Sequence, residues 1–247
     1  MADVETELPD ALVRALPLLR TRPAKPAAPD GYLDLLDGVR VASTNVAQAL
    51  WFTGIGSTLY DHGQAVARAV LSRWNPPLAT VVPCDGICLD VGCGPGNVTA
   101  QLGKLVGKKG LALGVDVSVA MLRRAVASAA PNVGFLRADA TDLPLLDDTF
   151  DAVTCYAVLQ LIPDPFAVLD QIARVLRPGG RILIMVPTVR FGPFDRLSRV
   201  LGKPGGVRLF GPDELADALA DRGFTEIKPT GFGPVQWIDA RLLASAA

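Results

Sequence analysis

A glycine-rich turn follows directly after a short apolar run, in the sequence ICLDVGCGPGN at residues 87–97. The apolar run predicts a buried strand, and the apolar side chains after Asn97 recur at helical spacing. Glycines at such a junction allow the backbone to turn sharply and to approach a ligand closely, with the N–H groups of the helix start pointing toward it. The segment therefore predicts an α/β fold with a ligand at this junction.

The same rhythm of short apolar runs and amphipathic stretches continues to residue 187, through LALGV, VGFL, FDAVTCY and RILIMV. Strands separated by helices pair in parallel through right-handed crossovers. We therefore expect residues 83–247 to form one α/β domain. Residues 1–30, rich in proline and alanine, are expected to be a flexible tail, and residues 31–82 an N-terminal helical cap.

Composition excludes several classes of function. The 247 residues carry a net charge of -1, so there is no general positive charge for a nucleic-acid backbone. Charges, prolines or glycines interrupt every candidate for a run of about 18 apolar residues, which excludes a spanning helix. The acidic start lacks the positive region of a secretory signal, and the 4 cysteines lack zinc-site spacing. We expect a cytoplasmic protein with reduced thiols and no metal.

The spacing of the glycines separates two cofactor classes. A dinucleotide fingerprint has the pattern G-x-G-x-x-G, whereas this chain has G-x-G-x-G followed by Asn97. Asp90, just before the turn, would repel a pyrophosphate but would suit a ligand with an ammonium and a sulfonium. Charge complementarity therefore favours S-adenosylmethionine, with a nicotinamide coenzyme as the less favoured alternative.

Two further acids stand at predicted strand ends. Asp116 ends the second strand, where a carboxylate can accept hydrogen bonds from both hydroxyls of a ribose. Asp139 follows the third strand, where a carboxylate could accept from an adenine amino group and the N–H of Ala140 could meet a ring nitrogen. The competing interpretation of Asp139 is a cap for its own turn.

These segments together resemble the class I S-adenosylmethionine-dependent methyltransferases, in the branch that includes quinone-biosynthesis and small-molecule enzymes. The resemblance covers roughly residues 84–187 and rests on four segments in the family's order: ICLDVGCGPGNVTAQL, LGVDVSVAMLRRA, FLRADATDLPLLDDTFDAV and IARVLRPGGRILI. It implies a Rossmann-like, seven-stranded, mostly parallel sheet with helices on both faces and an antiparallel last strand. It also implies a cofactor at the carboxyl ends of the first strands.

The resemblance assigns roles to individual positions. It implies that the methionine part of the cofactor is contacted by Asp90, Gly92 and Gly94. It also implies that Asp116 binds the ribose, and that Asp139 and Ala140 bind the adenine. Cys93, Val117 and Met121 complete the expected cofactor contacts. Tyr156, at the end of the fourth strand, would face the methyl group. Many relatives carry a histidine shortly after that strand, but this chain has Leu161 there.

The residues that would act on the methyl acceptor are less closely specified. His62, the single histidine, could take a proton from a hydroxyl with Tyr60 beside it, and Gln160 could orient the acceptor. A surface or capping role for His62 is the competing interpretation. We expect methyl transfer to a small, hydrophobic molecule, with oxygen slightly favoured over carbon as the acceptor atom. A non-catalytic binding or scaffold protein with the same fold is the alternative.

The segment of residues 188–210 combines basic and apolar side chains, which predicts either a lid-like insertion or a solvated helix packed on the core. A lid with a basic face would favour an apolar acceptor with an acidic group, or a peripheral contact with a membrane surface. The high mean hydropathy of +0.33 favours a homodimer with a buried apolar surface.

Overall fold

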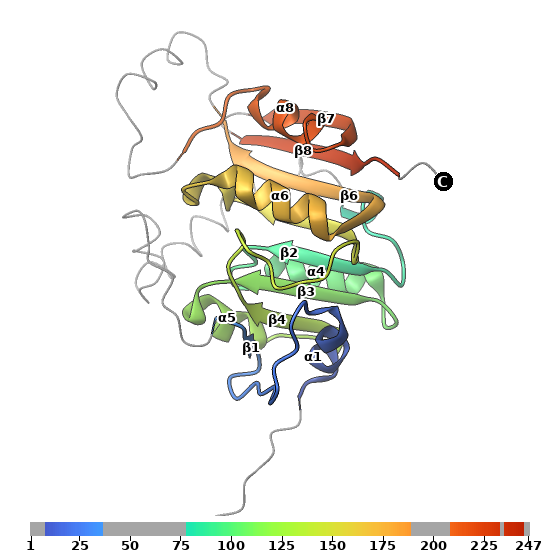
Figure 1. Ribbon diagram of the computed structural model, residues 1–247, viewed down its shortest axis with the longest axis vertical. Coiled ribbons are helices and arrows are strands. Elements are labelled where there is room, and N and C mark those ends of the chain that lie inside the picture. Colours follow the sequence, from blue (N-terminus) through green and yellow to red (C-terminus); the bar gives the residue numbers. More distant parts are fainter. Residues whose placement is uncertain (1–7, 37–77, 189–207, 233–234, 245–247) are drawn as a thin grey trace, which may run out of the picture.

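The computed structural model describes residues 8–36, 78–188, 208–232 and 235–244, which build one eight-stranded sheet. The strands lie in the order β1-β4-β3-β2-β5-β6-β8-β7 (Figure 1). Their bounds are β1 Leu33–Asp34, β2 Ile87–Val91, β3 Leu111–Asp116, β4 Val133–Arg137, β5 Phe150–Tyr156, β6 Leu176–Pro187, β7 Phe224–Phe232 and β8 Val235–Leu242.

The described helices are α1 Asp10–Ala15, α4 Asn97–Val106, α5 Val119–Val126, α6 Pro165–Val175 and α8 Glu214–Ala220, with short 3-10 turns η1 Leu16–Leu18, η2 Leu78–Thr80 and η3 Leu159–Leu161. Side chains begin two of these helices. The Ser118 hydroxyl accepts a hydrogen bond from the Met121 N–H at the start of α5. The Asp164 carboxylate accepts from the N–H groups of Phe166 and Ala167 at the start of α6. Both are N-caps of the kind that satisfy the free N–H groups of a first helical turn.

The strand directions confirm the predicted Rossmann-like class. Strands β1 to β6 pair in parallel, and the last strand, β8, runs antiparallel to both of its neighbours, β6 and β7. The sheet has eight strands, however, and not the expected seven. The additional strand is β1, which pairs Leu33 with Leu136 and Asp34 with Arg137 at the edge of β4. A two-residue pairing formed across a separation of about a hundred residues leaves no periodic signal in the sequence.

Residues 8–30 also differ from the expected flexible tail. Leu12 and Ala15 of α1 are fully buried, and Leu12 contributes to the hydrophobic core. The Arg14 guanidinium donates hydrogen bonds to the carbonyls of Gly110 and Lys109. The prolines in this segment lie outside the helix interior, so they interrupt the chain without preventing a short helix from packing on the sheet.

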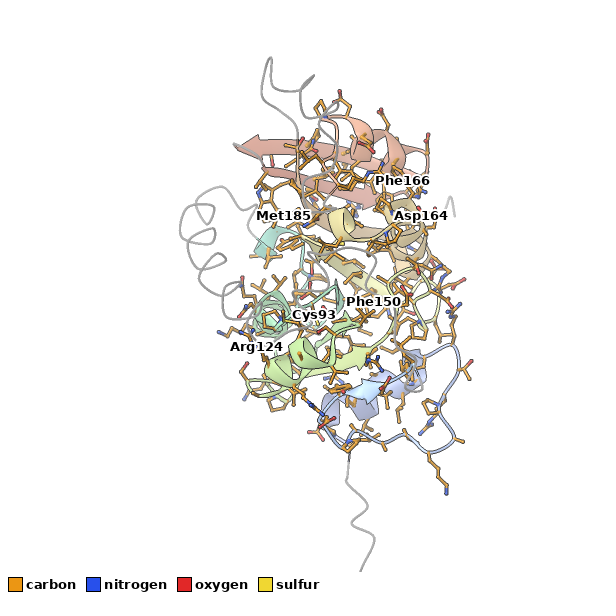
Figure 2. The ribbon with its side chains drawn as sticks, turned by 90° about the vertical axis from the view of Figure 1, so that its left-hand side faces the viewer. Cys93, Arg124, Phe150, Asp164, Phe166 and Met185 are labelled. Atoms are coloured by element: carbon orange, nitrogen blue, oxygen red, sulfur yellow. The ribbon has the colours of Figure 1, made fainter. Side chains whose placement is uncertain are left out.

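Two hydrophobic clusters cover the two faces of the sheet. One contains side chains of α1, α6 and α8 together with Phe150, and the other contains side chains of α4 and α5 together with Cys93. Figure 2 shows the sheet from the side, with Phe150 and Phe166 on the face opposite to Met185. Central strands are therefore buried on both faces, as expected for a parallel sheet.

The chain order predicts a ligand-binding crevice at the carboxyl ends of the central strands. From β2 the chain moves outward through β3 to β4, then returns to the other side of β2 to form β5 and β6. The loops after β2 and β5 therefore leave the sheet in opposite directions. Open α/β sheets bind their ligands between two such loops.

Among the described residues, no helix is long and apolar enough to cross a membrane.

Candidate cofactor site

The glycine-rich turn lies at this crevice, between β2 and α4. Gly92, Gly94 and Gly96 have φ angles of 69°, 51° and 78°, a backbone conformation that favours glycine. A Cβ atom at Gly92 would lie 2.2 Å from Val158 Cγ2, so a side chain does not fit there. Gly96 forms the N-cap of α4 without any side-chain hydrogen bond to the helix start. The turn is thus a glycine backbone, here called the cradle, that leads directly into the N-terminus of α4, whose first N–H groups have no partner within the helix.

Asp116 fixes this cradle from the end of β3. Its Oδ2 accepts a hydrogen bond of 2.8 Å from the Gly94 N–H, and its Oδ1 accepts one of 2.8 Å from the Ser118 N–H. Burial raises the pKa of this carboxyl group, while the backbone N–H groups that it accepts from oppose the shift. Each carboxylate oxygen has a second lone pair, so Asp116 can still accept from ribose hydroxyls.

Asp90 lies below the turn, with its side chain in the interior. Asp90 is 2% exposed, and its two oxygens accept hydrogen bonds of 2.7 Å from the hydroxyls of Thr99 and Thr154. Asp90 therefore ties α4 and β5 to the end of β2. Its contact with the cofactor stays a prediction. The carboxylate lies beneath the glycine turn, where its negative charge can attract a positively charged ligand without touching it.

The buried Asp90 should make the stability of the protein depend on pH. Burial raises its pKa from 3.8 to about 6, so between these values the folded state binds more protons than the unfolded chain. The free energy of unfolding should therefore fall as the pH rises through this range, by roughly 3 kcal/mol from this group. Asp90→Asn removes the titration, so its stability relative to the wild type should increase from pH 4 to pH 7 in urea unfolding. A difference that stays constant with pH would contradict the assignment.

The other predicted cofactor contacts surround the cradle. Cys93 is 7% exposed, and a Cβ at Gly114 would meet its Sγ at 2.9 Å, so its side chain packs on the sheet. Val117, whose carbonyl accepts from Arg137 Nε, follows Asp116, and Met121 is 4% exposed in α5. These contacts remain predictions.

Asp139 and Ala140 follow β4, next to Asp116. Asp139 Oδ1 accepts hydrogen bonds of 2.8 Å and 2.7 Å from the N–H and the hydroxyl of Thr141. Asp139 thus caps its own turn, as the competing interpretation predicted. This cap leaves Asp139 Oδ2 for the adenine contact, which stays a prediction, as does the contact of the buried Ala140.

The predicted acceptor-side residues follow β5. Tyr156 ends the strand, and Ala157 after it has a φ of 58°. Burial raises the pKa of Tyr156, and the charges of Asp90 and Asp239 raise it further, so the phenol stays protonated. Gln160, in η3, is 7% exposed, and its Oε1 is buried without a hydrogen-bond partner among the described residues.

Other predictions lie outside the described residues. They concern Tyr60 and His62, most of the expected helical cap (37–77) and residues 189–207 of the expected lid. Sequence reasoning also missed Trp237, whose ring meets Tyr156 edge to face with a centroid distance of 4.9 Å. The sequence holds no local signal for this contact, because it depends on the register of β8 against β6.

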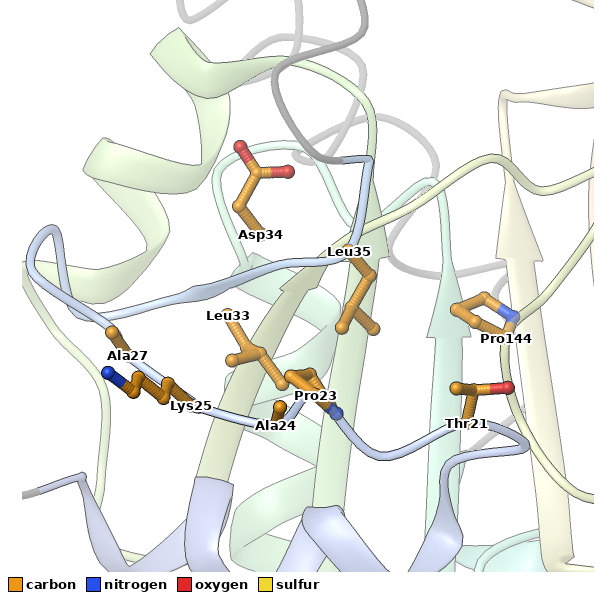
Figure 3. A pocket seen from close by; sticks show the side chains of 9 residues that line it. All are labelled: Thr21, Pro23, Ala24, Lys25, Ala27, Leu33, Asp34, Leu35 and Pro144. Atoms are coloured by element: carbon orange, nitrogen blue, oxygen red, sulfur yellow. The ribbon is translucent and has the colours of Figure 1, made fainter.

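The N-terminal segment borders a separate pocket of about 570 Å³, shown in Figure 3. Its lining comes from residues 21–27, from β1 with Leu35 and from Pro144. None of the predicted cofactor or acceptor residues contributes to it. The pocket is therefore distinct from the cradle.

Known proteins share this arrangement. A family model described as a methyltransferase domain matches residues 89–184. A demethylmenaquinone methyltransferase of Shouchella clausii is 41% identical over 165 residues, which cover 56% of this chain and 70% of that protein. The chain belongs to the class I S-adenosylmethionine-dependent methyltransferases. This confirms the family predicted from the four sequence segments.

Two further comparisons extend this result. A ubiquinone/menaquinone biosynthesis C-methyltransferase of Idiomarina loihiensis is 35% identical over 117 residues, covering 42% of this chain and 45% of that protein. The chain thus matches less than half the length of some curated relatives. A solved S-adenosylmethionine-dependent methyltransferase of Thermotoga maritima has a TM-score of 0.60 at 22% identity, covering 78% of this chain and 98% of that chain, and shows the same fold.

The site of this methyltransferase fits S-adenosylmethionine, the cofactor of its family. The glycine turn has no side chain at Gly92, where Val158 of the loop after β5 fills the space that a Cβ would need, so the turn and that loop lie close together. Asp116 offers carboxylate oxygens at the end of β3, and Asp90 places a second acid beneath the turn. Carboxylate acceptors of this kind suit a hydroxylated, positively charged ligand and not a diphosphate, which sets aside the nicotinamide alternative.

Proposed function

We propose that this methyltransferase transfers a methyl group to a ring carbon of a small, hydrophobic quinol. The observation that carries the proposal is the 41% identity to the demethylmenaquinone methyltransferase, over 70% of that protein. The name of the Idiomarina relative supports carbon as the acceptor atom. The slight preference for oxygen rested on His62 as a base, and that residue lies outside the described ones.

In the proposed reaction the protein itself forms no covalent bond, because the cofactor supplies the reactive methyl group. When bound, the cofactor would supply a methyl group on a positively charged sulfur, which leaves as a neutral thioether, and the methylated ring carbon would release its proton to water to restore the aromatic ring. The glycine turn and Asp116 would hold the cofactor, and Tyr156 would flank the acceptor at the end of β5. Their contribution is alignment and the exclusion of water, which together can remove several kcal/mol from a barrier.

A direct assay tests this proposal. We expect the protein to move a labelled methyl group from S-adenosylmethionine to naphthoquinols and benzoquinols kept reduced, with the label on a ring carbon by mass spectrometry and NMR. The matched control is the same compound in its oxidised quinone form, which should accept no methyl group because its ring is electron-poor. A methoxy product would instead support oxygen transfer. Cofactor binding without transfer to any quinol or phenol would support the non-catalytic alternative.

A further inference from the structure

Three side chains form a row across neighbouring strands at the carboxyl ends of β5 and β6. Tyr156 pairs with Met185 between β5 and β6, and Met185 pairs with Trp237 between β6 and β8. Residues paired in this way project from the same face of a sheet. Tyr156 packs against the cluster that contains Cys93, and Figure 2 shows Met185 on the side opposite to Phe166. The row therefore lies on the face that carries the start of α4.

The row joins the cofactor cradle through the loop after β5. Val158 follows Tyr156 by two residues, and its side chain occupies the space directly over Gly92. The Ala157 N–H donates a hydrogen bond of 2.9 Å to the Met185 carbonyl, which holds the end of β5 against β6. The row thus begins with Tyr156, at the end of the strand whose following loop contacts the glycine turn.

Trp237 carries an indole hydrogen-bond donor in this row. The residue is 3% exposed, and its Nε1 is buried with no acceptor among the residues that the structure describes. A buried N–H without a partner is unfavourable, and most indole N–H groups in protein interiors find one. The rings of Tyr156 and Trp237 meet at 86°, so the edge of one ring faces the other.

We propose that Trp237 binds the methyl acceptor, with its indole N–H donating a hydrogen bond to an oxygen of a hydroxylated aromatic ring. This inference rests on the proposed function and specifies the acceptor further, since a ring without an oxygen would leave the N–H unpaired. A donor to that oxygen favours its ionised form, which makes the adjacent ring carbon more nucleophilic. Trp237 would thus act on affinity and on the ionisation of the acceptor together.

Kinetics of Trp237→Phe test this role, because phenylalanine keeps an aromatic ring and removes the N–H. With a reduced naphthoquinol we expect kcat/KM to fall about tenfold, while the affinity for adenosylhomocysteine stays unchanged. The ascending limb of the pH profile of kcat should move to higher pH, because the acceptor ionises less readily. The matched control is Ile238→Val, which alters the opposite face of β8 and should leave both quantities as in the wild type.

Nuclear magnetic resonance of the indole N–H groups gives a second readout on the wild-type protein. The chain has 3 tryptophans, so nitrogen-labelled tryptophan yields few signals, and Trp237→Phe identifies the relevant one. A hydroxynaphthoquinone added with adenosylhomocysteine should move this signal downfield, whereas the parent naphthalene should not.

The outcomes separate the inference from the proposed function. If the wild type methylates quinols but the indole signal stays in place, or Trp237→Phe matches Ile238→Val, the role of Trp237 is overturned and the function stands. If the wild type methylates no quinol or phenol, the proposed function is overturned and this inference with it.

Discussion

Gly92→Ala is expected to weaken the binding of S-adenosylmethionine and adenosylhomocysteine by about a hundredfold, because the turn that would hold the cofactor must move and each hydrogen bond lost costs about 1 kcal/mol. The new Cβ would lie 2.2 Å from Val158 Cγ2, and alanine is strained at a φ of 69°. Either the turn or the loop after β5 must shift, and both border the crevice. Isothermal titration calorimetry measures the loss of affinity, and thermal unfolding should show a destabilisation of about 2–4 kcal/mol.

Gly107→Ala is the matched control for this substitution. Gly107 ends α4 with a φ of 74°, but a Cβ there has no atom within 4 Å. It therefore introduces backbone strain at a positive φ, of about 1–3 kcal/mol, without a collision. Its cofactor affinity should equal that of the wild type. Equal losses of affinity in the two variants would show that strain in the chain, and not the geometry of the cradle, controls binding.

Asp116→Ala is expected to reduce cofactor affinity by about a hundredfold, since hydrogen bonds to a charged group contribute roughly 1.5–3 kcal/mol each. The substitution removes the predicted acceptor for the ribose and leaves the N–H groups of Gly94 and Ser118 without their partner. Calorimetry with adenosylhomocysteine and with methylthioadenosine, which retains the ribose but lacks the amino-acid part, should show similar losses for both ligands.

Asp151→Ala controls for the loss of a carboxylate that accepts from the backbone. Asp151 accepts a hydrogen bond of 2.7 Å from the Ile87 N–H and pairs with Arg177, near the start of β5 and away from the crevice. We expect a comparable loss of stability with unchanged affinity for both ligands. Wild-type affinity in Asp116→Ala would remove Asp116 from the cofactor site.

The parts of the site that sequence reasoning predicted are the local ones. The strand, the glycine turn and the start of α4 form one continuous segment, and the glycine positions indicate a backbone that no other residue adopts easily. Asp116 could be placed because the carboxyl ends of neighbouring parallel strands meet at one edge. The predicted fold class agrees with the sheet order, and the predicted family and cofactor agree with the relatives. These predictions also rested on continuous sequence segments.

The features that sequence reasoning did not find depend on distant pairings. The hydrogen bonds of Asp90 are one example, because the hydroxyls that donate them belong to α4 and β5, whose approach a local pattern does not show. Trp237 reaches Tyr156 only through the register of an antiparallel strand that enters between β6 and β7. Residues 1–30 were expected to be a flexible tail because of their prolines, yet Leu12 is buried in the hydrophobic core.

Strand β1 has a consequence for the behaviour of the protein at high concentration. Without β1, β4 would present unpaired N–H and C=O groups, which another chain could use as a template for strand addition. Leu33 and Asp34 occupy these groups, and the Asp34 carboxylate holds the Arg137 side chain at 2.9 Å. A truncated protein that starts after residue 36 should therefore self-associate through its sheet edge, whereas one that keeps residues 8–36 should remain dispersed.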